Sequence, residues 1–455
     1  MKLRISQLFG YAAGDAGNNL AFSMASMFLL LYYTDVAGIP AAAAGTIFLV
    51  VRIWDGIGDL IAGRLVDKTS SRWGKFRPWL LFGSVPLLLL SVATFHVPDW
   101  GLTGKLIYAY VTYAALAMAY SLVNIPYGSL AAAMTQDSIE RSKLATARTM
   151  GAAAIMLLLA FVISPQVKNA ENLQYSLTMT TLVFVVVGVA LYLFTFATAR
   201  ETVHRDIEHV SLKQSLITLK RNRPLILLCA SSLFFLTAMF SLQKIGIYYA
   251  RDVLGNANYY IAITVAQIGL MFGLAPFVPK IVRRFGKKNG YIGGALVMIV
   301  GSLGVLFAPA SMPYVAIGFF VLIGAGLAVV NVLLWSFEAD TVEYGEWKTG
   351  ARTEGATYAV FSFVRKLGQA FGGSAAAYTI GLAGYVGGAQ VQSASALWGI
   401  RAAAGLVPAV LAGIAIAIMV VYPLTEKRFR EITAEVVQRR AERDAEDSQA
   451  SMPGA

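Results

Sequence analysis

The sequence predicts an all-α membrane protein that crosses the bilayer with about twelve helices. The first observation is composition: of 455 residues, 57% are hydrophobic and 14% are charged, whereas a soluble domain carries about a quarter of charged residues. Mean hydropathy is +0.63. The second and third observations are a series of long apolar runs and a charge pattern that alternates between loops. These long continuous runs exclude a transmembrane β-barrel, whose strands are short and alternate in polarity.

Each apolar run is roughly 20 to 30 residues long, which is enough to cross ~30 Å of hydrocarbon. The first run has no small-residue cleavage site after it, so we expect a retained first span and not a signal peptide. The expected spans cover residues 8–34, 41–66, 76–96, 103–133, 144–164, 176–198, 225–250, 258–282, 290–309, 313–338, 355–385 and 396–423.

Basic residues concentrate in alternate loops, at 64–77, 141–148, 200–223 and 280–288, and in the tail from Lys427. The intervening loops are nearly neutral. By the positive-inside rule, both termini and the central loop lie in the cytoplasm, which agrees with an even number of spans. The net charge of +12 is therefore a topology signal, and no nucleic-acid partner is expected.

A short string recurs in the two parts of the chain. Arg72-Trp-Gly-Lys75 follows the second span, and Arg284-Phe-Gly-Lys287 follows the eighth. The recurrence predicts two parallel six-helix halves, the arrangement of the major facilitator fold. The expected units are an N-terminal half, a cytoplasmic central loop, a C-terminal half and a cytoplasmic tail, at residues 1–198, 199–224, 225–423 and 424–455.

Two aspartates in the second span, Asp55 and Asp59, indicate a cation site. Residues four apart lie on one helix face, and an ionisable group inside a membrane usually faces the bundle interior and carries function. Arg52, at i−3 from Asp55, leaves a purely structural ion pair open as the alternative. A proton is favoured over sodium because Gly58, on the adjoining face, offers no oxygen ligand, although Ser121 in the fourth span offers one hydroxyl.

Polar residues also occur inside the first and fourth spans. Asp15 and Asn18 are three apart and give the first span one polar face. A sugar site usually combines an aromatic ring with hydrogen-bonding groups, and Tyr127, near Asn124, is the aromatic residue best placed for such a site.

Two lysines lie within apolar runs of the second half. Lys366, in the eleventh span, is expected to pair with an inner aspartate or with an anionic substrate. Lys244 lies nearer the outer end of the seventh span and is expected only to snorkel to the interface. No metal site, catalytic constellation or cofactor motif is expected, so a membrane enzyme or sensor is a remote alternative.

The cytoplasmic loops carry charges for an inner gate. Asp67 and Arg72 lie in the loop after the second span, and Asp340 and Glu343 lie on the cytoplasmic side, opposite Arg141 and other basic residues. We expect some of these groups to pair across the halves and bias one gating state. The alternative is that they only set the topology.

Several specific strings occur along the chain. They are Gly14-Asp15-x-x-Asn18-Asn19, Arg52-x-x-Asp55-x-x-x-Asp59, Arg72-Trp-Gly-Lys-Phe-Arg-Pro78, Ser121-Leu-Val-Asn124-Ile-Pro-Tyr127-Gly, Glu338-Ala-Asp340-Thr-Val-Glu343-Tyr-Gly-Glu346 and Arg352-Thr-Glu354-Gly. Together they make the chain similar to the glycoside–pentoside–hexuronide:cation symporters, a branch of the major facilitators. The resemblance covers residues 1 to about 430, and the strings at 121–130, 338–346 and 361–366 are most similar to carriers of glucuronides.

The resemblance implies residue roles. Asp55 and Asp59 match the acids of the family's cation site, and Ser121 matches a hydroxyl ligand beside them. Asp15 matches an acid that binds sugar hydroxyls. Arg148 matches an arginine of the sugar site.

Lys366 matches a lysine that joins the cation and sugar sites. The departures from the melibiose carriers of the family are informative. Asn124 stands where those carriers have a further sugar-binding acid, Gly128 where they have a tryptophan, and Gly58 where they have an amide beside the cation. The first departure favours an anionic sugar, and the last agrees with proton coupling.

The implied function is secondary active transport: proton-coupled symport of a glycoside, in the first place a glucuronide, into the cell by alternating access. The expected protein is a monomer in the bacterial inner (plasma) membrane, with the coupling ion and the glycoside as its small-molecule partners. Sodium coupling, and a neutral glycoside, a pentoside or a lysolipid as cargo, stay open as alternatives.

Overall fold

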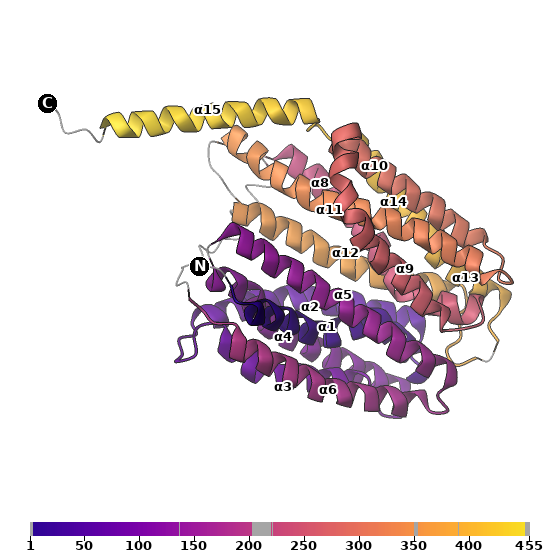
Figure 1. Cartoon of the computed structure of the whole chain (residues 1–455). Helices are drawn as coiled ribbons and strands as arrows, with labels where there is room; N and C mark the ends of the chain where they lie inside the picture. Colours follow the sequence, from indigo (N-terminus) through magenta and orange to yellow (C-terminus); the bar gives the residue numbers. More distant parts are fainter. Residues whose placement is uncertain are drawn as a thin grey trace.

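The computed structural model describes residues 3–135, 137–202, 220, 222–349, 354–389 and 391–450. Within these residues, every regular element is a helix (Figure 1). Most of the central loop expected at 199–224 lies outside the described residues.

The N-terminal half contains six long helices. A five-residue π-helical segment, Tyr32–Val36, extends the first of them to the outer end of the bundle. The helices are α1 (Ile5–Leu31), α2 (Ala41–Asp67), α3 (Arg77–Thr94), α4 (Leu102–Met134), α5 (Ser138–Asn169) and α6 (Leu173–Thr198).

The C-terminal half repeats this plan. Its first helix is again extended by a π-helical segment, Tyr249–Val253, and its last span consists of two helices that meet at Gly405. The helices are α8 (Arg223–Tyr248), α9 (Tyr259–Leu274), α10 (Val278–Phe307), α11 (Pro313–Thr349), α12 (Glu354–Leu382), α13 (Ala394–Ala404) and α14 (Leu406–Val420), followed by α15 (Glu426–Ala450) in the tail.

Within the described residues, nine helical stretches are long and apolar enough to span a membrane. One of them, Tyr259–Phe307, contains two spans, because Gly286 interrupts it with non-helical backbone. α1 and α12 are not among these nine stretches, although they are as long as the helices that are. Polar and charged residues inside the bundle lower their hydropathy. With these helices counted, the expected all-α, twelve-span architecture is confirmed.

The two loops with the recurring string have the same backbone construction. Gly74 and Gly286 both have a positive φ, 104° and 78°, a conformation that favours glycine. In each half, a glutamate that follows the last membrane span accepts hydrogen bonds from the backbone N–H groups just after the glycine. Glu201 accepts from residues 75–77 at 2.8–3.0 Å, and Glu426 accepts from Lys287 at 3.0 Å. This matched construction supports the internal duplication.

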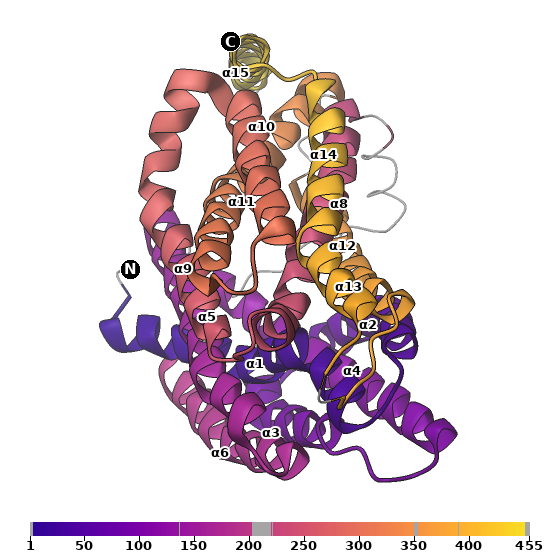
Figure 2. The same cartoon turned by 90° about the vertical axis from the view of Figure 1, so that its right-hand side faces the viewer.

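The two halves lie side by side, and both chain termini lie at the same end of the bundle (Figures 1 and 2). Across the interface between the halves, α2 packs against α12, α5 against α9 and α1 against α8. The polar residues of α1, α2 and α12 therefore face one another near the centre of the molecule.

Candidate functional site

The two aspartates of α2 share a hydroxyl donor. Ser121 of α4 lies 3.0 Å from an Asp55 oxygen and 2.7 Å from an Asp59 oxygen. The Asp55 side chain is 3% exposed and that of Asp59 is 30% exposed. Arg52 also contacts Asp55, at 3.2 Å. The three residues expected at the cation site are therefore brought together, with Asp59 nearer to water.

Lys366 reaches this cluster from the other half. Its ammonium nitrogen lies 3.5 Å from an Asp55 oxygen and directly contacts a carboxylate oxygen of Asp59. Of the two partners expected for Lys366, an inner aspartate or an anionic substrate, the structure shows the inner aspartates. Since α2 and α12 belong to different halves, this ion pair links the cation site to the half–half interface.

A second ion pair lies on α1 and α5. Arg148 Nε donates to Asp15 at 2.9 Å, and Asn19 donates to the other Asp15 oxygen at 2.9 Å. The Asp15 side chain is 5% exposed, whereas 41% of the Arg148 side chain is exposed. Gly128 leaves open space beside the guanidinium, because a Cβ there would lie 4.0 Å from the nearest arginine nitrogen. The acid is thus buried and the arginine faces a space.

Among the described residues, two buried amide atoms of the sugar-site candidates have no hydrogen-bond partner. They are the side-chain nitrogen of Asn18 and the side-chain oxygen of Asn124. The oxygen of Asn18 already accepts from Tyr192 at 2.7 Å. A buried polar group normally has a partner, so this donor and this acceptor are unsatisfied in the structure.

Tyr127 is fully buried and supports the sugar-site candidates from behind. Its ring stacks on Tyr11 at a centroid distance of 4.7 Å, and its hydroxyl donates to the Tyr11 carbonyl at 2.6 Å. The Arg148 guanidinium lies over the ring, 5.4 Å from its centroid. Tyr127 therefore positions Arg148 in this structure, and its hydroxyl is occupied.

Three of the expected inner-gate residues contact partners in their own halves. Asp340 pairs with Lys287 at 2.6 Å, Arg141 donates to the Thr135 carbonyl at 3.0 Å, and Arg72 lies over the ring of its neighbour Trp73. Glu343 is partly buried on α11, and the Asp67 side chain lies outside the described residues. Pairing of these groups across the halves stays a prediction.

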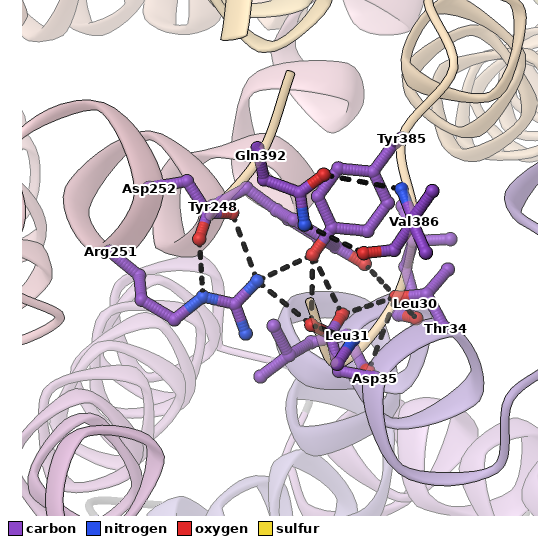
Figure 3. A network of polar contacts seen from close by, with 11 residues as sticks. Leu30, Leu31, Thr34, Asp35, Tyr248, Arg251, Asp252, Tyr385, Val386 and Gln392 are labelled. Atoms are coloured by element: carbon purple, nitrogen blue, oxygen red, sulfur yellow. Dashed lines mark hydrogen bonds and ion pairs between the residues drawn. The ribbon is translucent and has the colours of Figure 1, made fainter. Parts of the chain in front are cut away.

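The outer end holds a cross-half network that the sequence analysis missed (Figure 3). We call Thr34, Asp35, Tyr248, Arg251 and Tyr385 the outer network. Arg251 pairs with Asp35 at 2.9 Å, Tyr385 donates to Asp35 at 2.8 Å, and the Thr34 and Tyr248 hydroxyls lie 2.7 Å apart. The structure is therefore closed at its outer end. The available signal was the presence of charges in loops that are otherwise nearly neutral.

The expectation that Lys244 only snorkels to the interface is wrong. Lys244 is 6% exposed, and its ammonium nitrogen lies 3.9 Å from the ring centroid of Phe48 on α2. The outer network closes the halves over this part of α8, so the side chain points between them and not toward the membrane surface. On α12, Arg365 lies over the ring of Trp335.

Two helical halves around a central, charged site define a secondary transporter. Residues 10–426 match the model of the MFS/sugar transport protein family, and the chain belongs to this family. The resemblance to the glycoside–pentoside–hexuronide:cation symporters is thereby confirmed, and the protein is an integral, multi-pass membrane protein. Within the described residues, no cluster of histidine, cysteine and acidic side chains could hold a metal ion.

Known proteins resemble the chain over nearly its whole length. It is 45% identical over 438 residues to the glucuronide carrier protein homolog of Escherichia coli (strain K12), with 95% of each chain covered. It is 35% identical over 444 residues to the uncharacterized symporter YjmB of Bacillus subtilis (strain 168), with 96% of each covered. The nucleoside transporter NupG shares the fold, with a TM-score of 0.63 at 11% identity over 92% of this chain and 98% of that chain. The protein is thus a sugar or glycoside symporter of the major facilitator type.

Proposed function

We propose that this protein imports a glucuronide together with protons by alternating access. The observation that carries the proposal is the cluster of Asp55, Asp59 and Lys366, in which two acids of one half are bridged by a cation of the other half. A proton that binds one of these acids removes a charge from the bridge, and the interaction between the halves changes with it. Ion loading and movement of the halves are thereby coupled.

The oxygen ligands favour a proton over sodium. A hard cation needs several oxygen ligands at once, and the oxygens here are those of Asp55, Asp59 and Ser121. Gly58 adds no side-chain ligand, and its position packs against Met118. The Lys366 ammonium already occupies the space next to both acids. A proton needs only one carboxylate oxygen, and the partly exposed Asp59 gives it access to water.

Three observations support a glucuronide as the cargo. The relative at 45% identity is described as a glucuronide carrier protein homolog. Asn124 adds no negative charge beside the sugar-site candidates. The free donor and acceptor of Asn18 and Asn124 suit the hydroxyl groups of a sugar ring.

A neutral glycoside is the second candidate, and a specific observation favours it. Arg148 is paired with Asp15, and Lys366 is paired with Asp55 and Asp59. If these two cations serve only to balance the charge of the acids, the central site has no net attraction for an anion. An uncharged glycoside or pentoside would then fit equally well.

Uptake into proteoliposomes tests the proposal. Labelled phenyl β-D-glucuronide and labelled phenyl β-D-glucoside are offered separately, each under an imposed pH gradient or an imposed sodium gradient. We expect glucuronide uptake driven by the pH gradient. Uptake driven by sodium alone would overturn the proton assignment, and uptake of the glucoside alone would move the assignment to a neutral glycoside.

A further inference from the structure

Lys244, a buried lysine between the halves, has no role in the site described above. Its ammonium nitrogen lies 3.9 Å from the Phe48 ring centroid and donates a long hydrogen bond of 3.4 Å to the Ala25 carbonyl. A ring face and one distant carbonyl are weak partners, because a buried charge is stable only when it is paired or fully hydrogen-bonded. A carboxylate would complete this environment.

A narrow chamber rich in hydrogen-bond donors surrounds Lys244. Two cations, two amides and two hydroxyls line it, and the rings of Phe48 and Phe240 complete its wall. No acidic side chain is among the described residues that line it. Such a donor set matches the acceptor-only oxygens of an ionised carboxylate. The polar lining consists of Ser26, Arg52, Tyr113, Gln243, Lys244 and Gln369.

Helix α12 lies tightly against the lysine stem. Gly373 is buried there, and a Cβ atom at this position would lie 2.8 Å from the Lys244 Cε atom and 3.5 Å from Phe48. Without a side chain at 373, the Lys244 stem fits between α12 and α2. The chamber is thus built from both halves and closes when they meet.

Arg52 connects the chamber to the cation site. Its guanidinium lies 3.2 Å from Asp55, and Arg52 and Tyr113 also line a neighbouring cavity that includes Asp55. An anion in the chamber would attract Arg52, so the Arg52–Asp55 interaction would depend on whether the chamber is occupied. Substrate binding and protonation of Asp55 would then influence each other.

We propose that this chamber binds the carboxylate group of a sugar acid, with Lys244 as the charged ligand. The assignment rests on the proposed function, because it places the carboxylate of the transported glucuronide. The cations of the central site, Arg148 and Lys366, are already paired with carboxylates, whereas the partners of Lys244 are a ring and a carbonyl. The carboxylate therefore selects the anionic sugar through α8.

The test compares two ligands that differ in one carboxylate. Phenyl β-D-glucuronide and phenyl β-D-glucoside are titrated into purified wild type, Lys244→Gln and Lys244→Arg. Lys105→Gln is the matched control, because Lys105 pairs with Asp99 in an outer loop and not in the chamber. The Lys244→Gln variant loses a charge-assisted hydrogen bond, so its affinity for the glucuronide should be roughly tenfold or more below that of the wild type. Its affinity for the glucoside should be unchanged. Lys244→Arg should retain most of the glucuronide affinity.

Two results would overturn the assignment. One is unchanged glucuronide affinity in Lys244→Gln. The other is an equal loss of affinity for both ligands, which would mean that Lys244 only stabilises the contact between the halves. If Lys244→Gln does not fold, Gly373→Ala serves as the test, because it keeps the lysine charge but displaces the lysine stem. A loss of affinity for the glucuronide alone supports the assignment, and an equal loss of affinity for both ligands overturns it. Wild type that binds the glucoside but not the glucuronide would refute the proposed cargo itself, so the two failures are distinguishable.

Discussion

The ammonium nitrogen of Lys366 lies 3.5 Å from a carboxylate oxygen of Asp55, and this ion pair joins the two halves of the molecule. Asp55 lies on α2 and Lys366 on α12, helices that pack against each other at the interface. A proton on the acid removes its negative charge and weakens the electrostatic attraction between Lys366 and α2. The contact therefore converts ion binding into a bias on the position of the halves.

Replacement of Lys366 by glutamine is expected to uncouple transport. The interaction between partly buried ions contributes about 1.5–3 kcal/mol, so accumulation of glucuronide under a pH gradient should fall roughly tenfold or more. Exchange of labelled for unlabelled substrate, which needs no net proton movement, should persist. If the variant lost glucuronide uptake but kept uptake of the glucoside, Lys366 would be a carboxylate ligand and not a coupling residue.

Breaking the outer network should open the outer end of the molecule. The side chains of Asp35 and Arg251 are 8% and 21% exposed. Asp35→Asn should weaken the interaction between them by about 1–2 kcal/mol. Ala377 is fully buried on α12, close to Gly45 of α2. Ala377→Cys, in a Cys229→Ala background, reports on opening of the outer end. Its thiol should react with an impermeant maleimide roughly tenfold faster when Asp35 is replaced.

Asp99→Asn is the control for the outer network. Asp99 pairs with Lys105 at 2.9 Å near the outer end, but within one half. The labelling rate should not change in this variant. If Asp35→Asn and Asp99→Asn accelerated the labelling equally, the labelling rate would report a general increase in flexibility and not separation of the halves.

Glu201→Gln is expected to destabilise the N-terminal half. The Glu201 carboxylate accepts backbone N–H groups of Lys75, Phe76 and Arg77, and the loss of charge weakens all three bonds, by about 1–3 kcal/mol in total. The unfolding temperature of the purified protein in detergent should fall by several degrees. Glu171→Gln, a change at an exposed acid of an outer loop, should leave it unchanged, and an equal fall in both variants would contradict this role of Glu201.

The predicted inner gate is tested by reversing one charge. Glu343→Lys should slow glucuronide uptake severalfold, while the amount of protein in the membrane stays constant. Glu431→Lys is the control, because Glu431 pairs with Arg428 on the exposed face of α15. Unchanged uptake in Glu343→Lys would remove Glu343 from the gate.

The parts of the fold and site that depend on one helix could be predicted from the sequence. The spacing of Asp55 and Asp59 fixes their common face whatever the packing of the helix. Their burial follows from the apolar run around them, since only a polar interior accommodates such groups in a membrane. The same reasoning predicted a partner inside the bundle for Lys366, and an inner aspartate was one of the two partners that it left open.

The contacts that depend on the meeting of the halves could not be predicted. Asp35 and Arg251 lie in the π-helical segments of different halves, and Tyr385 follows α12. Only tertiary packing brings the three residues together. Lys244 is close in sequence to an outer loop, so its burial depends on how the outer network closes the interface. For Tyr127, the sequence indicated an aromatic residue near the sugar site but not that its hydroxyl is used by Tyr11.

The most direct test of the central claim is proton movement that accompanies the substrate. A concentrated glucuronide solution is added to lightly buffered, de-energised vesicles that contain the wild type or Asp55→Asn, and the external pH is recorded. We expect an alkaline shift with wild type, because inward flow of the sugar carries protons with it, and no shift with Asp55→Asn. An equal shift in both would place the coupling site elsewhere, and glucuronide entry without any shift in the wild type would contradict proton symport.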